Sequence, residues 1–259
     1  MWRFFLQLCV LSGTAIAQQS LVLTFSNSTN TELNYKKTNT GYYNHISDSL
    51  SSGWDIFTQP LIYTDGTLSN FTVSIADVAN ETANVTSFSG DAEKIKQLFG
   101  TNAINGVLTR ESAPILQLSN LTAGSYTLHV LAARGNKAIS EDIPTTYSLA
   151  PYKNETISVT TSIEAFSTSV SIPEPQLVEE TSIKAYTINT SSTANYASNW
   201  VLIKFDIDLE NDITKLTLNA SGNYGNIAGI VLTTIPEPTV SMLSVITFAA
   251  LAFTRRRKL

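Results

Sequence analysis

The sequence of 259 residues contains a single cysteine and only two histidines. The cysteine, Cys9, lies in an N-terminal segment that we expect to be removed during export, so the mature chain would have no thiol for a disulfide bond, a nucleophile or a metal ligand. The two histidines, His45 and His129, belong to no spacing typical of zinc sites, and no nucleophile-elbow motif of a serine hydrolase is present. The stability of the chain must therefore come from its hydrophobic core.

Charged residues are also scarce, at 14% of the chain, and acidic residues outnumber basic ones by 21 to 16. Five of the basic residues lie at the two ends of the chain, namely Arg3, Arg255, Arg256, Arg257 and Lys258. The part between the ends is therefore more acidic than the formal net charge of −5 suggests. Such a surface repels phosphate backbones, which argues against nucleic acid as a partner.

The N-terminal residues have the composition of a secretory signal peptide. Arg3 supplies a positive charge, Phe4–Leu11 form an apolar segment, and residues 15–17 read Ala-Ile-Ala, as at an A-x-A cleavage site. We therefore expect residues 1–17 to direct export through the Sec translocon. Signal peptidase would cleave between Ala17 and Gln18.

The C-terminal tail, residues 235–259, has three parts: a Pro-Glu-Pro motif, an apolar run and a basic cluster. The apolar run over 239–254 predicts a transmembrane helix, although about 16 residues at about 1.5 Å each fall short of the roughly 30 Å hydrocarbon core. The basic cluster should stay on the cytoplasmic side, which places the rest of the chain outside the cytoplasm. A buried C-terminal helix is the alternative, and four consecutive basic residues argue against it. The residues that define the motif are Pro236, Glu237, Pro238, Arg255, Arg256 and Arg257.

This tail resembles the PEP-CTERM sorting signal of Gram-negative bacteria. The resemblance implies cleavage near the Pro-Glu-Pro motif by an exosortase-type membrane protease, in bacteria that make exopolysaccharide. The chain would be anchored in the membrane by its C-terminal helix before processing, and would then reach the cell surface or the extracellular matrix. The same tetrapeptide at Ile172–Pro175 is followed by polar residues. We expect a loop there, because two prolines remove backbone donors and restrict their neighbours.

The remaining body, residues 18–234, is rich in Thr, Ser, Asn, Val, Ile and Tyr, which is typical of β-strands. We expect one all-β domain rather than two small ones. A single short helix is predicted at Glu93–Phe99, capped by Asp91 and ended by Gly100. Strands are predicted at Leu21–Phe25, Asn70–Ile75, Ile115–Leu118, Ser125–Ala133, Thr156–Thr161, Ile183–Asn189, Trp200–Leu209, Ile213–Ala220 and Ile227–Thr233.

Period-two patterns support a β-sandwich of the jelly-roll kind. The clearest hairpin joins Trp200–Leu209 to Ile213–Ala220 through a polar turn. The segment Leu118–Leu128 resembles the L-x-G-L-x-x-G-x-Y-x-L strand motif of galactose-binding-like jelly rolls, with Asn120 in place of the usual glycine. Gly225–Ile230 resembles their last strand. This resemblance implies a fold more than a ligand.

One carboxylate cluster stands out in the sequence, and it consists of Asp206, Asp208, Glu210 and Asp212. Asp206 and Asp208 share one face of a predicted strand, so they are a weak candidate for a Ca²⁺ site. With Glu210 they are also the candidate acids of a glycan-active hydrolase. The simpler interpretation is a solvated face opposite Phe205 and Ile207. Apart from this weak candidate, we expect no metal site and no cofactor.

Aromatic residues near predicted loops offer a way to bind sugars, because their faces stack on pyranose rings. The candidates are Trp54, Tyr63 and Trp200, and Tyr42 and Tyr43 border loops as well. The sequence therefore predicts an exported, non-catalytic β-sandwich that binds carbohydrate or exopolysaccharide or acts in adhesion. Two alternatives remain open: an extracellular glycan-active hydrolase, and a structural matrix protein without a discrete ligand.

Overall fold

The computed structural model describes residues 18–27, 30–48, 53–76, 87–88, 92–100, 108–110, 115–133, 144–167, 173–186, 196–197, 199–222 and 225–236. Residues 19–235 form one compact unit. The predicted signal peptide and the predicted transmembrane helix lie outside the described residues. Within the described part of the chain, no helix is both long and apolar enough to cross a membrane.

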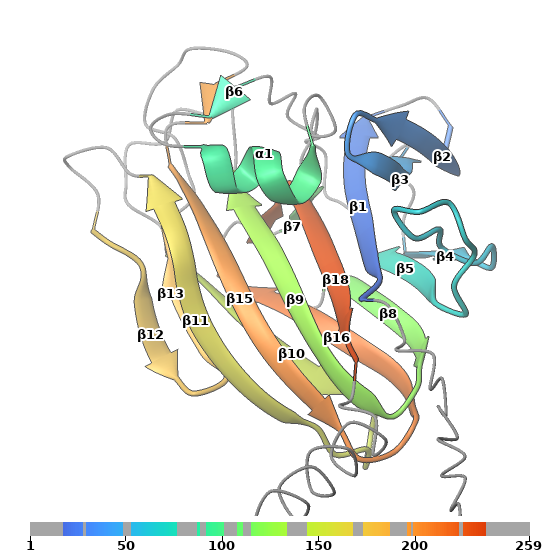
Figure 1. Ribbon diagram of the computed structural model, residues 1–259. Helices are drawn as coiled ribbons and strands as arrows, with labels where there is room; N and C mark the ends of the chain where they lie inside the picture. Colours follow the sequence, from blue (N-terminus) through green and yellow to red (C-terminus); the bar gives the residue numbers. More distant parts are fainter. Residues whose placement is uncertain are drawn as a thin grey trace, which may run out of the picture. The chain divides into compact units, whose positions relative to one another are not determined.

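Two seven-stranded sheets pack face to face as a β-sandwich (Figure 1). The first, called sheet A, has the order β11-β15-β9-β18-β1-β3-β2, and all its neighbouring strands are antiparallel except the parallel pair β1 and β3. Its strands are β1 (Ser20–Asn27), β2 (Glu32–Thr38), β3 (Gly41–Asp48), β9 (Gly124–Ala133), β11 (Ser158–Ser167), β15 (Trp200–Leu209) and β18 (Gly229–Ile235).

The second sheet, called sheet B, is antiparallel throughout and has the order β12-β13-β10-β16-β8-β5-β4. Its strands are β4 (Trp54–Phe57), β5 (Thr72–Ala76), β8 (Leu116–Leu121), β10 (Thr145–Pro151), β12 (Gln176–Glu179), β13 (Ser182–Ala185) and β16 (Ile213–Ser221). Two small pairs complete the described strands: β14 (Tyr196–Ala197) with β6 (Ser87–Phe88), and β17 (Gly225–Ile227) with β7 (Leu108–Arg110).

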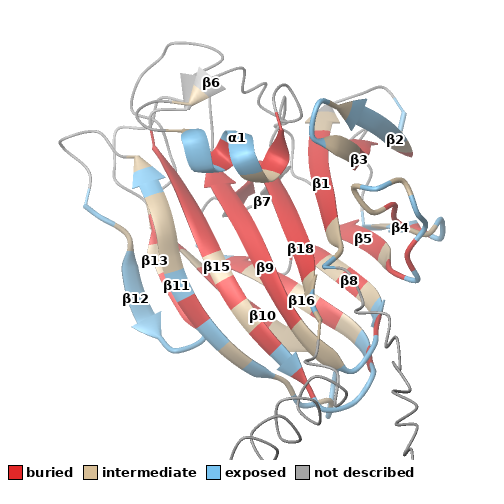
Figure 2. Cartoon of the chain, in the orientation of Figure 1, coloured by how far each residue is buried: buried red, intermediate tan, exposed pale blue. Residues whose placement is uncertain are grey.

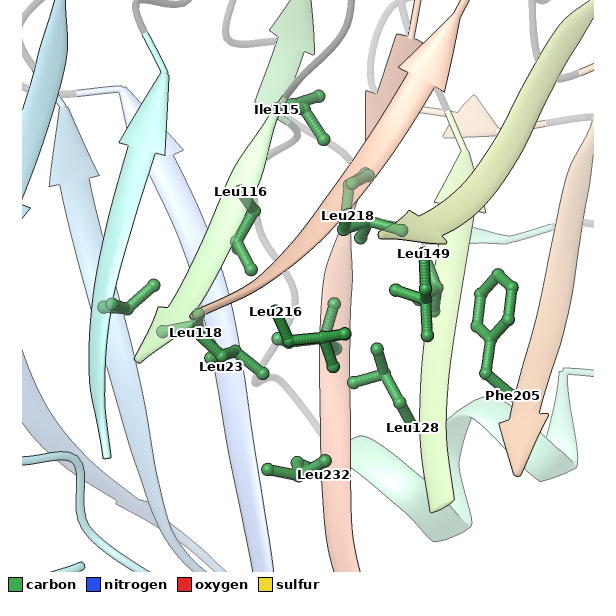
Figure 3. Packing of buried hydrophobic residues seen from close by; sticks show 14 of the residues in the cluster. Leu23, Ile115, Leu116, Leu118, Leu128, Leu149, Phe205, Leu216, Leu218 and Leu232 are labelled. Carbon is green, nitrogen blue, oxygen red and sulfur yellow. The ribbon is translucent and has the colours of Figure 1, made fainter. Parts of the chain in front are cut away.

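The core lies between the two sheets and is built by alternation along the strands (Figure 3). Leu128 of β9, Phe205 of β15 and Leu232 of β18 point inward from sheet A. They meet Leu216 and Leu218 of β16, from sheet B. Because every second side chain is inward, the residues between them occupy the outer face of sheet A.

The single helix of the described residues, α1 (Glu93–Phe99), lies on that outer face (Figure 1). Ile95 and Phe99 are buried there in a second apolar cluster, which includes Leu131, Trp200 and Val231 of the sheet. The predicted span and its end at Gly100 are confirmed, because the Gly100 N–H donates to the carbonyl oxygen of Lys96 at 2.9 Å. The predicted cap is wrong: the N-cap position is Ala92, and no side chain caps it.

The prediction of an all-β body with one short helix is confirmed, and each of the nine predicted strands overlaps an observed one. Trp54, which we expected in or beside a loop, is instead the first residue of β4. Eight observed strands were not predicted: β2, β3, β4, β6, β7, β10, β12 and β14. β2 and β12 are edge strands with mostly exposed residues, so they lack the apolar alternation that marks a strand in sequence.

Asn120 stands at the position where the jelly-roll motif that the sequence resembles has a glycine. Its φ is 65°, in the left-handed region that glycine usually occupies and that asparagine tolerates better than most residues. A few residues on, the hydroxyl of the buried Tyr126 donates to the carbonyl oxygen of Thr122 at 2.7 Å. This hydrogen bond ties the start of β9 to the turn that follows β8.

Candidate functional site

A hollow of about 210 Å³ lies on the outer face of sheet A, beside the C-terminal end of α1. Val22 of β1 and Val231 of β18 contribute apolar lining from the sheet. Helix α1 contributes Gln97, Leu98 and Phe99. The hollow therefore forms where the short helix covers only part of a broad sheet.

The turn between β2 and β3 forms another side of the hollow through Thr38 and Thr40. Their hydroxyl groups lie 2.8 Å apart, and the Thr40 N–H donates to the Thr38 hydroxyl at 3.2 Å. The end of α1 approaches this turn closely, since a Cβ placed on Gly100 would lie 2.8 Å from the Thr38 hydroxyl oxygen. The helix end and the turn therefore lie close together, with no room for a side chain at position 100.

The segment that follows β4 supplies Thr64, which is tied to sheet A by two backbone hydrogen bonds. The Tyr42 N–H donates to the Thr64 carbonyl oxygen at 2.9 Å, and the Thr64 N–H donates to the Ser20 carbonyl oxygen at 2.8 Å. A buried amide reinforces the attachment: the Asn44 Nδ2 group donates to the carbonyl oxygens of Val22 and Ile62, both at 2.9 Å, and the Ile62 N–H donates to Asn44 Oδ1 at 2.8 Å.

The lining is rich in hydroxyl groups, and no charged side chain is found among the described residues that form it. Hydroxyls come from Ser20 and Thr233 at the sheet and from the threonines described above. Tyr42 and Tyr43 add phenol groups, and burial raises the pKa of Tyr43, so its hydroxyl stays protonated at neutral pH. Hydroxyl and amide groups over an apolar floor can hydrogen-bond a neutral polyhydroxylated ligand and also cover its apolar face.

The aromatic residues predicted to stack on sugars do not come together. Trp54 is 37% exposed on β4, at an edge of sheet B, whereas Trp200 belongs to sheet A. Trp200 is 1% exposed beneath the helix, so its indole face is not free to meet a ligand. Tyr63 packs against the core and makes an edge contact with Phe71. The aromatics at the hollow are instead Tyr42, Tyr43 and Phe99.

The acidic cluster is divided between a sheet face and a turn. Asp206 and Asp208 lie on the outer face of sheet A while Phe205 and Ile207 are buried, which confirms the solvated-face interpretation. Asp206 accepts hydrogen bonds from the Lys204 ammonium at 2.7 Å and from the Thr127 hydroxyl at 2.9 Å.

Asp208 and Asp212 also accept hydrogen bonds from other groups of the protein. Asp208 accepts a hydrogen bond from the Ser125 hydroxyl at 2.5 Å, and Asp212 accepts one from the Ala123 N–H at 2.8 Å. Glu210 is exposed in the turn. No group of three or more metal-ligating side chains is found among the described residues, so the pair Asp206 and Asp208 gains no third ligand there.

His129 lies next to Val231 in the sheet, on the same outer face as the hollow. Its Nε2 is 3.6 Å from Glu164 Oε2, and the same carboxylate oxygen pairs with the Lys94 ammonium of α1 at 2.9 Å. Burial, with help from Lys204 and Lys94, lowers the pKa of His129 despite the opposing effect of Glu164. The salt bridge between Lys94 and Glu164 connects the helix to strand β11.

His45 is 1% exposed and lies between two hydroxyl groups of β1. Its Nδ1 is 2.9 Å from the Thr24 hydroxyl, and its Nε2 is 2.8 Å from the Ser26 hydroxyl. A serine and a histidine at that distance could form a nucleophile and its base, but the other ring nitrogen meets a hydroxyl rather than a carboxylate. Burial and then Lys36 lower the pKa of His45 to about 4, which makes it a weak base. We interpret this group as structural.

The pKa of His45 predicts that acid destabilises the protein. A histidine in the unfolded chain titrates near pH 6.5. Between pH 6.5 and 4, His45 is therefore protonated in the unfolded chain but neutral in the folded chain. The contribution of His45 to the free energy of unfolding is therefore complete above about pH 6.5. It is lost as the pH falls towards 4, and the loss amounts to about 3 kcal/mol. Urea unfolding at several pH values should show this slope, and it should flatten in His45→Gln. Equal slopes in the two proteins would contradict the assignment.

The residues of the predicted sorting motif and cleavage sites lie mostly outside the described part of the chain. Gln18 and Pro236 are described, the first exposed and the second half-buried after β18. The predictions for the others therefore stay untested by the structure; these residues are Ala17, Glu237, Pro238, Arg255, Arg256 and Arg257.

The fold and the hollow define a β-sandwich with a hydroxyl-rich site on one outer face. Comparison of the chain with protein-family models, with curated proteins and with solved structures found no match in any of the three. The function is therefore inferred from the sequence and from the site itself.

Sequence reasoning did not identify Ser20, Thr38, Thr40 or Gln97 as site residues. Serine and threonine are abundant throughout the chain, so their presence carried no signal. Tyr42 and Tyr43 were noted only as aromatics near a loop. What brings these residues together is the pairing of β1 with β18 and β3, across long sequence separations.

Proposed function

We propose that this chain is an exported, non-catalytic β-sandwich that binds a neutral carbohydrate, part of an exopolysaccharide, in the hollow beside α1. The observation that carries this proposal is the lining: in the part of the chain that the structure describes, it consists of hydroxyl, phenol and amide groups over an apolar floor, without a charged side chain. Such a surface offers hydrogen bonds that a sugar can complete, without the repulsion or desolvation that a fixed charge would add.

The proposal includes sorting to the cell surface or matrix. The support is sequence only: the likeness of residues 235–259 to a PEP-CTERM signal and of residues 1–17 to a signal peptide. The Sec translocon, signal peptidase and an exosortase-type protease would be the processing partners. The kinship of the body with galactose-binding-like jelly rolls is proposed on the same footing, from the motif at Leu118–Leu128 and from the left-handed Asn120.

Intact mass measurement of the protein from its producing cells tests the sorting. We expect a chain that begins at Gln18 and ends near Pro236, and we expect it outside the inner membrane. Deletion of the exosortase gene should leave the tail attached. A protein that keeps Leu259 in cells with an intact exosortase would contradict the proposed processing.

Glycan binding tests the site. The purified mature protein should bind neutral glycans on an array, and Ser20→Phe, which places a ring in the hollow, should weaken binding by about tenfold or more, a change of about 1.4 kcal/mol. Ser221→Phe, at the exposed end of β16 in sheet B, is the matched control for an added ring and should bind normally. If no glycan binds, the alternative of a structural matrix protein is favoured.

A further inference from the structure

We propose that the hollow is one end of a longer track, along which an extended neutral polysaccharide chain crosses the outer face of sheet A. This inference rests on the proposed function and extends it from a single sugar to a chain. The track is a line of side chains that runs across the strands from β1 to β11. Its members are Ser20, Thr233, Thr127, Asp206 and Thr160.

The strand register places these residues opposite one another in succession. Ser20 pairs with Thr233, and Thr233 pairs with Thr127. Thr127 then pairs with Asp206, and Asp206 with Thr160. They share the outer face because their chain neighbours, such as Leu21, Leu232, Leu128 and Phe205, point into the core. Five strands at about 4.8 Å spacing make the line about 19 Å long, so it extends well beyond the hollow.

Hydrogen bonds between neighbours organise the line. The Ser20 and Thr233 hydroxyls lie 3.0 Å apart, and the Thr127 hydroxyl donates to Asp206 Oδ1 at 2.9 Å. Thr233 and Thr127 are buried and form the floor of the track, whereas Ser20 is half-buried, Thr160 is exposed and the side chain of Asp206 is 42% exposed. The groups that a ligand can reach are therefore those of Ser20, Asp206 and Thr160, and each of them can accept a hydrogen bond from a sugar hydroxyl.

The line is continuous with the hollow, since Ser20 and Thr233 belong to both. On the helix side of the line, the outer face is buried beneath α1 (Figure 2). Away from the helix, the same strands show intermediate and exposed residues (Figure 2). A chain that leaves the hollow is therefore directed along the line rather than under the helix.

The charges beside the track favour a neutral chain. Lys204 pairs with Asp206 at 2.7 Å, and Lys94 pairs with Glu164 at 2.9 Å. Partial burial alone would raise the pKa of Glu164, but the hydrogen bond from Lys94 and the positive charges around it lower that pKa, so the carboxylate is ionised at neutral pH. Both lysines beside the track are thus already paired with acids, and the exposed Asp208 has a hydroxyl partner only. A strongly anionic polymer would have to compete with those pairs and would be repelled by Asp208.

Affinity as a function of chain length tests the track, with ladders of gluco-, galacto- and manno-oligosaccharides measured by calorimetry on the mature protein. For the ladder that binds, affinity should rise with length until the chain fills the track. The double variant Asp206→Asn, Thr160→Ala should lose about fivefold on long chains, as expected for one or two hydrogen bonds, and nothing on the shortest. Glu210→Gln, an exposed acid in the turn, is the control and should bind all lengths as the parent does.

The results of these binding measurements distinguish a failure of the proposed track from a failure of the proposed binding function. Affinity that does not depend on length would overturn the track and leave the hollow as a single-sugar site. Equal loss on short and long chains in the double variant would also overturn it, because the residues would then act through the hollow. If no oligosaccharide binds to the parent protein, the proposed function itself fails.

Discussion

Replacing Asn44 with aspartate is expected to lower the free energy of unfolding by about 4 kcal/mol. Asn44 is fully buried, and its side chain makes three hydrogen bonds that hold the segment around Ile62 against sheet A. Aspartate has nearly the same shape, but it puts an acceptor oxygen where the amide donates to two carbonyl oxygens. A buried charge would then face two carbonyl dipoles, or a proton would have to be taken up.

Urea unfolding of the purified protein measures this loss. Asn211→Asp makes the same chemical change at an exposed position of the turn between β15 and β16, and it should alter stability by no more than about 0.5 kcal/mol. An Asn44→Asp protein that unfolds at the parent's urea concentration would show that the amide does not hold this segment. The hollow would then need another explanation for the position of Thr64.

Gly41→Ala should cost about 3 kcal/mol or more and should also abolish binding at the hollow. Gly41 has a φ of 132°, and a Cβ there would lie 3.2 Å from the carbonyl carbon of Thr64 and still closer to its oxygen. Backbone atoms cannot rotate away, so β3 or the segment with Thr64 must shift. Both carry residues that line the hollow.

Gly124 provides the control that separates conformational strain from the clash. Its φ is 139°, close to that of Gly41, but a Cβ there would meet no heavy atom within 4 Å. Gly124→Ala should therefore cost only the conformational strain, about 1–2 kcal/mol, and should leave binding unchanged. Equal losses in the two variants, by thermal or urea unfolding, would show that the contact with Thr64 is unimportant.

The central strands could be predicted because each is long and alternates inward and outward residues. Val201, Ile203 and Phe205 share the core face of β15, and the turn to Ile213 begins the next strand, as the pattern indicates. The same alternation correctly placed Asp206 and Asp208 on the outer face. An alternating pattern predicts which face of the sheet each residue occupies, because side chains point alternately to the two sides of a strand.

The site could not be predicted in the same way. Its lining comes from β1, the turn between β2 and β3, the segment with Thr64, the end of α1 and β18, which only the tertiary fold brings together. The helix at Glu93–Phe99 was predicted from the local sequence, but a local sequence does not say which face of which sheet the helix covers. Trp200 was predicted to stack on a sugar because it borders a loop in the sequence. In the fold it is buried under that helix.

Hydrogen exchange with mass spectrometry, on the protein with and without a saturating neutral glycan from the array, tests the location of the site most directly. Binding in the hollow should slow exchange at residues 38–43, 97–100 and 231–233, and a long chain should extend this protection to 125–129 and 204–208. Protection that falls instead around Trp54 and sheet B would contradict the account, because the glycan would then occupy a different face of the sandwich.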